Sequence, residues 1–121
     1  MDEILARLRA ALKTAMKARD TAAVTAVRAA LSAIDNAGAV APTGEAGPPA
    51  EGPIAGAVRG LGAAEATRRN LSDGDIAALV WAEVSERDEA ADVYEQAGRA
   101  DDAQRLRDEA AALRQVLVAG P

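Results

Sequence analysis

Basic side chains spaced four residues apart are the first candidates for chemistry in this sequence. Arg9, Lys13 and Lys17 recur at this interval, with Arg7 and Arg19 nearby, and Arg28 follows in the next segment. Residues four apart share one face of an α-helix, so these cations suit contacts with the phosphates of a nucleic acid. The same pattern is typical of a solvated helix flank whose aliphatic stems cover apolar surface. The residues alone leave both interpretations open.

Carboxylates are dense between residues 83 and 109, where they invite comparison with a metal site or a pair of catalytic acids. The acids there alternate with Arg87, Arg99, Arg105 and Arg107 at helical spacing, which is typical of a solvated helix surface. The chain has no Cys and no His. Thiol nucleophiles, Cys/His zinc sites and His-based acid–base catalysis are therefore excluded. We expect no metal, no cofactor, no catalytic residue and no enzymatic activity of the chain's own.

Charge is unevenly distributed along the chain. Residues 1–40 carry six Lys or Arg against four Asp or Glu, whereas residues 72–121 carry five against twelve. Nucleic-acid affinity depends on neutralising phosphates, so any such binding must use the N-terminal part. No apolar run is long enough to span a bilayer, and no signal-peptide pattern precedes Asp2 and Glu3. We expect a cytoplasmic protein without a membrane partner.

The elements that position these side chains are predicted to be helices. Half of the residues are apolar, but alanine dominates, and there are one Trp, one Tyr and no Phe. This composition favours helices packed on thin seams, and no period-two strand pattern is present. We expect an all-α fold with four main helices, arranged as two antiparallel helical hairpins with a Gly/Pro-rich loop between them. Residues 1–37, 38–71 and 72–121 are the N-terminal hairpin, the connector and the C-terminal hairpin of one domain.

Helical periodicity predicts two helices in the first part of the chain. The first covers residues 2–18, with an apolar face made of Ile4, Leu5, Leu8, Leu12, Ala15 and Met16. Asp20 is the predicted N-cap of the second, which ends near Ala37 and has Val24, Val27, Leu31 and Ile34 as its apolar seam. So short a break makes the two helices antiparallel neighbours.

The connector is distinguished by its glycines and prolines. Residues 38–62 hold seven of the ten glycines and four of the five prolines. We expect residues 41–53 to be a mobile loop, because they cannot bury enough apolar surface to become ordered. Residues 54–61 are less polar and could dock on the helices as a short ordered piece.

A capping box, Ser72 with Asp75, predicts the start of a third helix of about 25 residues. Its buried stripe is expected to contain Ile76, Val80, Val84, Ala91 and Tyr94. Gly98 occupies the position of a C′ glycine that would end this helix. The last helix is predicted from about Asp101, with a stripe formed by Ala103, Leu106, Ala110, Leu113 and Leu117, and with an i,i+4 ion pair between Asp101 and Arg105.

Several short patterns outside residues 38–70 match one protein family. The first half carries Lys13-x-Ala15-Met16-Lys17-x-x-Asp20 and Arg28-x-x-Leu31-x-x-Ile34, and the second half carries Leu71-Ser72 and Glu83-Val84-x-x-Arg87. The most specific pattern is Tyr94-Glu95-x-Ala97-Gly98-Arg99-x-Asp101-x-Ala103, continued by Glu109 and Leu113. On these residues the chain resembles the helical domain of the GatB/YqeY family. That family comprises the tail of the GatB component of the aspartyl/glutamyl-tRNA amidotransferase and related stand-alone proteins.

The resemblance implies a non-catalytic, YqeY-like helical domain related to a carbon–nitrogen ligase that uses glutamine as amido donor. Its implied partner is tRNA or a tRNA-handling protein. The catalytic activities of the amidotransferase lie in other domains, so the resemblance implies no catalytic residue here. The chain departs from the family at Ala82 and Ser85, where basic residues are frequent, and in the shortened ending Leu113–Val118. It matches a short form that lacks the family's second helical domain.

The four residues of the most specific pattern, Tyr94, Gly98, Arg99 and Asp101, have a structural explanation. They fit a tight corner between two helices, with Gly98 in a left-handed conformation, Asp101 capping the final helix and Arg99 pairing locally. Tyr94 at a core position is expected to pack. Trp81 lies about 100° of helical rotation from the stripe centre, and we expect it to pack, for example against residues 54–61, rather than to meet a partner.

Two other interpretations compete with the family resemblance. Tyr94, Gly98 and Ala103 also resemble the turn of a tetratricopeptide repeat, but no second copy appears at that repeat's period of about 34 residues. The acidic balance of the chain also fits a helical protein-interaction module with no nucleic-acid role. The sequence does not indicate the oligomeric state.

Overall fold

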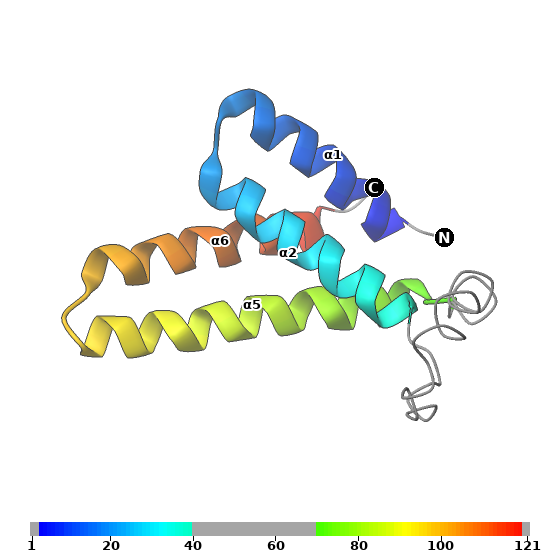
Figure 1. The fold of residues 1–121 in the computed structure, drawn as a ribbon. Coiled ribbons are helices and arrows are strands. Elements are labelled where there is room, and N and C mark those ends of the chain that lie inside the picture. The colour runs from blue at the N-terminus through cyan, green and yellow to red at the C-terminus, as the bar shows by residue number, and fades with distance from the viewer. Residues whose placement is uncertain (1–2, 40–69, 120–121) are drawn as a thin grey trace, which may run out of the picture.

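The computed structural model describes residues 3–39 and 70–119, which form four α-helices and contain no strand (Figure 1). These are α1 (Glu3–Ala18), α2 (Thr21–Gly38), α5 (Asp73–Gln96) and α6 (Ala100–Val118). The all-α prediction is confirmed for these residues. Gly38, predicted to begin the connector, belongs to α2 and is buried. The predictions for residues 41–53 and 54–61 lie outside the described residues.

The break between α1 and α2 is set by Asp20. Its Oδ1 accepts a hydrogen bond of 3.1 Å from the backbone N–H of Ala23, so Asp20 is the N-cap of α2 as predicted. Arg19, the residue before it, has a φ of 58° and lies in the left-handed region. These two residues therefore end one helix and begin the next within a single turn.

The start of α5 is fixed by the predicted capping box. Ser72 Oγ accepts a hydrogen bond of 3.0 Å from the backbone N–H of Asp75. The Asp75 carboxylate in turn accepts one of 3.0 Å from the backbone N–H of Ser72. Both local donors at this helix end are satisfied, which confirms the capping box.

The corner between α5 and α6 is a Schellman motif centred on Gly98, whose φ is 81°. The backbone N–H of Arg99 donates to Tyr94 O at 2.8 Å, and that of Gly98 donates to Glu95 O at 3.0 Å. The predicted C′ glycine is confirmed. The prediction that Asp101 caps the final helix is wrong, because α6 begins at Ala100 and its N-cap is Arg99, which makes no side-chain capping bond. Asp101 lies in the first turn instead.

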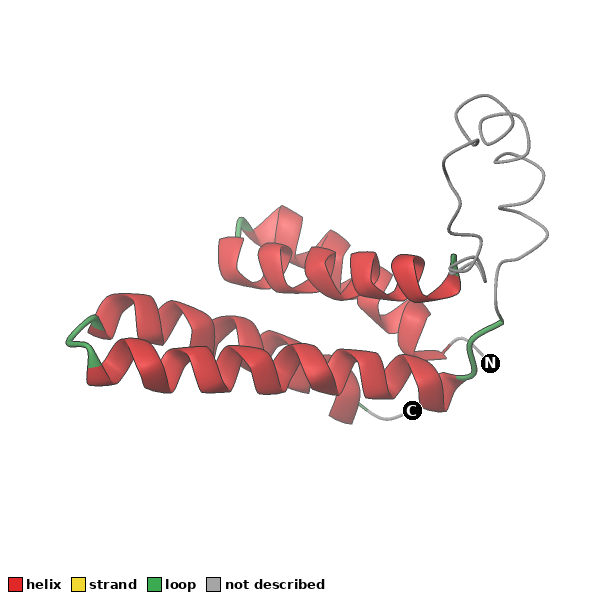
Figure 2. Cartoon of the chain, turned by 60° about the horizontal axis from the view of Figure 1, so that its bottom comes forward, coloured by secondary structure: helices red, strands yellow, loops and turns green. Residues whose placement is uncertain are grey.

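The four helices share one hydrophobic core. α5 and α6 run side by side in opposite directions, and α2 packs mainly on α6 with α1 beside it (Figures 1 and 2). The core draws on all four helices: Ile4, Leu8, Ala26, Val27, Ala30, Ile34, Ile76, Val80, Val84, Ala110, Leu113 and Val116. Small side chains make up a quarter of this set, so the helices meet on thin seams, in agreement with the alanine-rich composition.

Several residues of the predicted apolar stripes are less buried than expected, among them Met16 and Tyr94. Met16 is 51% exposed, because the turn between α1 and α2 stands away from α5 and α6 (Figure 1). Tyr94, near the end of α5, is half-buried, with the Arg99 guanidinium over its ring. Trp81, which was placed off the stripe centre, is 44% exposed, and the residues 54–61 expected to pack against it lie outside the described residues. The apolar stripes thus identify the side of each helix that faces the core, but not how deeply each residue is buried.

Candidate nucleic-acid interface

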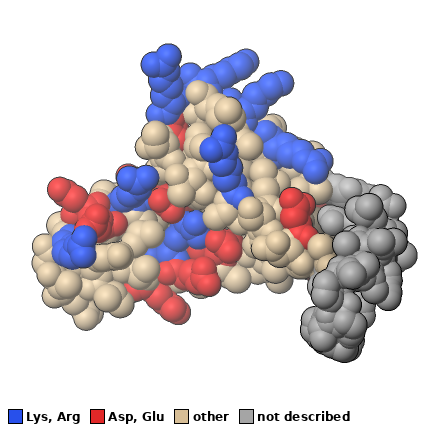
Figure 3. Space-filling view, in the orientation of Figure 1, with Lys and Arg blue, Asp and Glu red and all other residues tan. Residues whose placement is uncertain are grey.

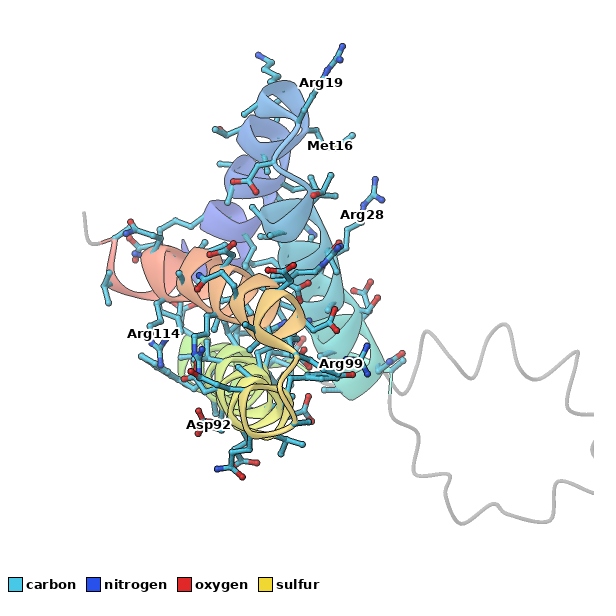
Figure 4. The ribbon with its side chains drawn as sticks, turned by 90° about the vertical axis from the view of Figure 1, so that its left-hand side faces the viewer. Met16, Arg19, Arg28, Asp92, Arg99 and Arg114 are labelled. Atoms are coloured by element: carbon cyan, nitrogen blue, oxygen red, sulfur yellow. The ribbon has the colours of Figure 1, made fainter. Side chains whose placement is uncertain are left out.

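The cations predicted to contact phosphate are all exposed. Arg9, Lys13 and Lys17 lie on α1 and Arg28 lies on α2. Arg19, at the turn between the two helices, is exposed as well. We call these five residues the basic face. Figure 3 shows Lys and Arg gathered over α1 and α2, and Figure 4 shows Arg19 and Arg28 projecting from the ribbon toward the same side, with Met16 between them.

No side chain of the basic face forms an ion pair or a hydrogen bond within residues 3–39 and 70–119. The arginines of α5 and α6 behave in the opposite way, because every one of them is paired with a carboxylate. These pairs are Arg87 with Glu83 and Glu109, Arg99 with Asp102, Arg105 with Glu109, Arg107 with Asp92 and Glu95, and Arg114 with Asp88. The unpaired cations of the described residues are therefore concentrated on α1, α2 and the turn between them.

Arg7 is the one basic residue of α1 that is not part of this face. Its Nη1 donates to the carbonyl oxygen of Ala119, at the C-terminus of α6. Its Nε is buried without a hydrogen-bond partner. A cation placed on the last carbonyls of a helix stabilises that end of the helix dipole, so Arg7 serves the packing of α1 against α6.

The two helix pairs carry opposite charge. Residues 3–39 contain six Lys or Arg against three Asp or Glu, a net charge of +3, and residues 70–119 contain five against twelve, a net charge of −7. In Figure 3 acidic side chains gather over α5 and α6, below the blue group at the top. A polyanion is therefore attracted to one end of the molecule and repelled by the other.

Hydroxyl groups extend the basic face along α2. Thr21, Thr25 and Ser32 are exposed and share a helical row with Arg28. In the order Thr21, Thr25, Arg28, Ser32 the intervals are four, three and four residues. Hydroxyls and cations both donate hydrogen bonds to phosphate oxygens. The sequence analysis did not identify these hydroxyls, although their spacing from Arg28 places all four residues on one face of a helix.

One part of the acidic stretch departs from the prediction of a solvated surface. Glu109 is 5% exposed, and its Oε1 accepts a hydrogen bond of 2.9 Å from Arg87 Nε. Arg87 also donates to Glu83 Oε1 at 2.7 Å. Burial alone would lower the pKa of Arg87, but its hydrogen bonds to Glu83 and Glu109 outweigh this effect and raise the pKa above the ordinary value. The network joins α5 to α6. Arg105 also contacts Glu109, at 3.5 Å, and does not form the predicted pair with Asp101.

The residues of the most specific sequence pattern occupy the corner between α5 and α6, far along the chain from the basic face. The Arg99 guanidinium lies over the Tyr94 ring at 5.0 Å from its centroid, and Arg99 pairs with Asp102 at 2.8 Å. The predicted local pairing of Arg99 is confirmed. Together with the left-handed Gly98, these contacts give Tyr94 and Arg99 a role in holding the corner.

A shallow groove of about 450 Å³ lies between α1, α2 and the end of α6. Alanines form much of its lining, and Arg7 and Asp20 are its titratable residues. Arg7 binds Ala119 and Asp20 caps α2, so the groove has no acid–base pair.

Within residues 3–39 and 70–119, no group of three or more His, Cys, Asp or Glu could hold a metal ion. None of the helices described combines the length and apolarity required to cross a bilayer.

The chain has no significant match to a protein-family model, to a curated protein or to a solved structure.

Proposed function

We propose that this chain is a non-catalytic helical domain of the GatB/YqeY type that binds tRNA through its basic face. In this proposal two helical hairpins, joined by the Gly/Pro-rich connector, act as a scaffold that presents cations to the RNA. In this proposal the carbon–nitrogen ligase chemistry associated with the family belongs to other proteins or domains. The sequence has no Cys and no His, and so neither a thiol nucleophile nor a His-based acid–base group.

One observation carries the proposal. The five cations of the basic face are exposed and make no ion pair within the described residues. Elsewhere in the structure every described arginine of α5 and α6 has a carboxylate partner. A solvated helix surface does not require its cations to be unpaired. Phosphate binding does require cations whose charge is not already neutralised by neighbouring carboxylates.

A second candidate function rests on the exposure of Trp81. This side chain is 44% exposed on acidic α5, and exposed Trp residues are enriched at protein–protein interfaces. An acidic helical module that binds a protein through this surface would have no need of the basic face. The two functions therefore differ in which helices the partner contacts.

Binding of tRNA by matched variants tests the proposal. Lys13→Ala/Lys17→Ala removes two positive charges from the basic face, and Ala82→Glu/Ala111→Glu lowers the net charge equally at exposed positions of α5 and α6. We expect the first variant to weaken tRNA binding at least about tenfold, since electrostatic affinity falls with every phosphate that is no longer neutralised, and the second to change it little. Equal binding by the wild type and the Lys13/Lys17 variant would favour the protein-interaction module.

A further inference from the structure

The basic face has cations and hydroxyls but no aromatic ring. The whole chain contains two aromatic residues, Trp81 and Tyr94, and both lie on α5. The Tyr94 ring is already covered by the Arg99 guanidinium. Proteins that hold single-stranded nucleic acid stack its bases on aromatic side chains, and each such contact strengthens binding substantially. The basic face therefore lacks the group that a single strand requires.

The basic face is also poorly equipped to read base edges. Base readout uses Asn, Gln, Asp and Glu as well as Arg and Lys, and the five residues of the basic face are Arg and Lys alone. In double-stranded RNA the major groove is too deep and narrow for side chains to reach the bases. The groups present on this face, long cations and short hydroxyls, are those that bind phosphate and sugar.

Helical geometry holds these groups at regular intervals. Arg9, Lys13 and Lys17 follow one another at steps of about 6 Å along α1, because four residues rise by this distance. Arg28 and its neighbouring hydroxyls form a second row on α2. Two rigid rows suit a repeating, rigid array of phosphates such as a duplex provides. A flexible single strand would not require this regularity.

From these observations we infer that the basic face binds a double-stranded RNA stem through its backbone, without selectivity for base sequence. This inference rests on the proposed function and specifies which part of the RNA is bound. The net negative charge of α5 and α6 repels phosphates from the opposite end of the molecule, so one stem lies on one face.

Competition against labelled tRNA tests the inference with the full chain. The competitors are two RNA duplexes of equal length with different base sequence, and an unstructured RNA single strand with the same number of nucleotides. We expect the two duplexes to displace tRNA equally, within about twofold, because phosphate contacts carry no sequence information. The single strand should require at least about tenfold higher concentration, because this face offers no aromatic ring on which a base could stack.

The outcomes separate the inference from the proposed function. If tRNA binds but the single strand competes as well as the duplexes, or the two duplexes differ by about tenfold, backbone recognition of a stem is wrong while tRNA binding stands. If vesicles of anionic lipid displace tRNA as effectively as the duplexes, the face binds dispersed negative charge and the inference is again wrong. If tRNA does not bind, the proposed function fails, and the inference fails with it.

Discussion

Arg87 Nε lies 2.9 Å from Oε1 of Glu109, and this hydrogen-bonded ion pair joins α5 to α6 beside the hydrophobic core. The two side chains are 12% and 7% exposed. A buried charge is tolerated only when it is paired, so the two residues depend on each other. The pair holds α5 against α6, although both helices are rich in acidic residues.

Removal of one member of this pair should destabilise the fold. Glu109→Ala leaves the guanidinium of Arg87 buried with Glu83 as its remaining carboxylate partner. We expect the free energy of unfolding, measured by urea denaturation, to fall by about 3 kcal/mol. Arg87→Met/Glu109→Leu, which replaces both charges by apolar groups, should lose less than the single variant. An unchanged urea midpoint for Glu109→Ala would show that the pair contributes little.

Two glycines provide opposite tests of backbone conformation. Gly98 has a φ of 81°, and a Cβ there would meet no atom within 4 Å, so Gly98→Ala should be disfavoured by conformation alone. We expect a loss of about 1 kcal/mol in the free energy of unfolding. Gly74 lies in the first turn of α5 with room for a Cβ, and Gly74→Ala should leave stability unchanged or raise it by up to about 1 kcal/mol. Thermal melting that shows equal effects would contradict the left-handed corner.

The N-terminus of α5 depends on a hydroxyl. Ser72→Ala removes the oxygen that accepts from the backbone N–H of Asp75, and we expect it to lower the free energy of unfolding by about 1 kcal/mol. Ser85 is exposed in the middle of the same helix, and Ser85→Ala should change stability by less than about 0.5 kcal/mol. Urea denaturation of both variants measures the difference. A similar effect from the two substitutions would mean that the capping box is energetically unimportant.

Two neighbouring arginines of α1 should separate stability from binding. Arg7 contacts the C-terminus of α6, whereas Arg9 is exposed and unpaired among the described residues. Arg7→Ala should lower the free energy of unfolding by about 1 kcal/mol, and Arg9→Ala should change it by less than about 0.5 kcal/mol. In a tRNA titration of the folded proteins, Arg9→Ala should bind tRNA more weakly than Arg7→Ala does, although it is the more stable of the two variants. Equal free energies of unfolding for the two variants would contradict the structural role assigned to Arg7.

Local signals in the sequence predicted the helix boundaries well. Asp20, Ser72 with Asp75, and Gly98 all act where the sequence placed them, because capping and left-handed turns depend on residues only a few positions apart. The sequence signal for the N-cap of α6 was weaker. Arg99 has no capping side chain, so Asp101, the next strong N-cap residue type, was wrongly assigned that role.

Features that depend on contacts between helices were not predictable from spacing. The charge pattern of residues 83–109 is that of a solvated surface, and nothing local marks Glu109 as the acid that faces Arg87 across α5 and α6. Met16 fits the apolar stripe of α1, but its side chain is exposed and does not pack in the hydrophobic core. The exposure of the cations on α1 and α2 followed from helical spacing, whereas their lack of ion pairs required the positions of every neighbouring acid.

The salt dependence of tRNA binding tests the central claim most directly. If all five cations of the basic face contact phosphates of a duplex, the logarithm of the association constant should fall against the logarithm of salt concentration with a slope of about −4.5. For Lys13→Ala/Lys17→Ala the slope should be shallower by about 2, one for each phosphate contact removed, while Ala82→Glu/Ala111→Glu should keep the wild-type slope. A Lys13→Ala/Lys17→Ala variant with the slope of the wild type would show that the basic face does not bind RNA phosphates.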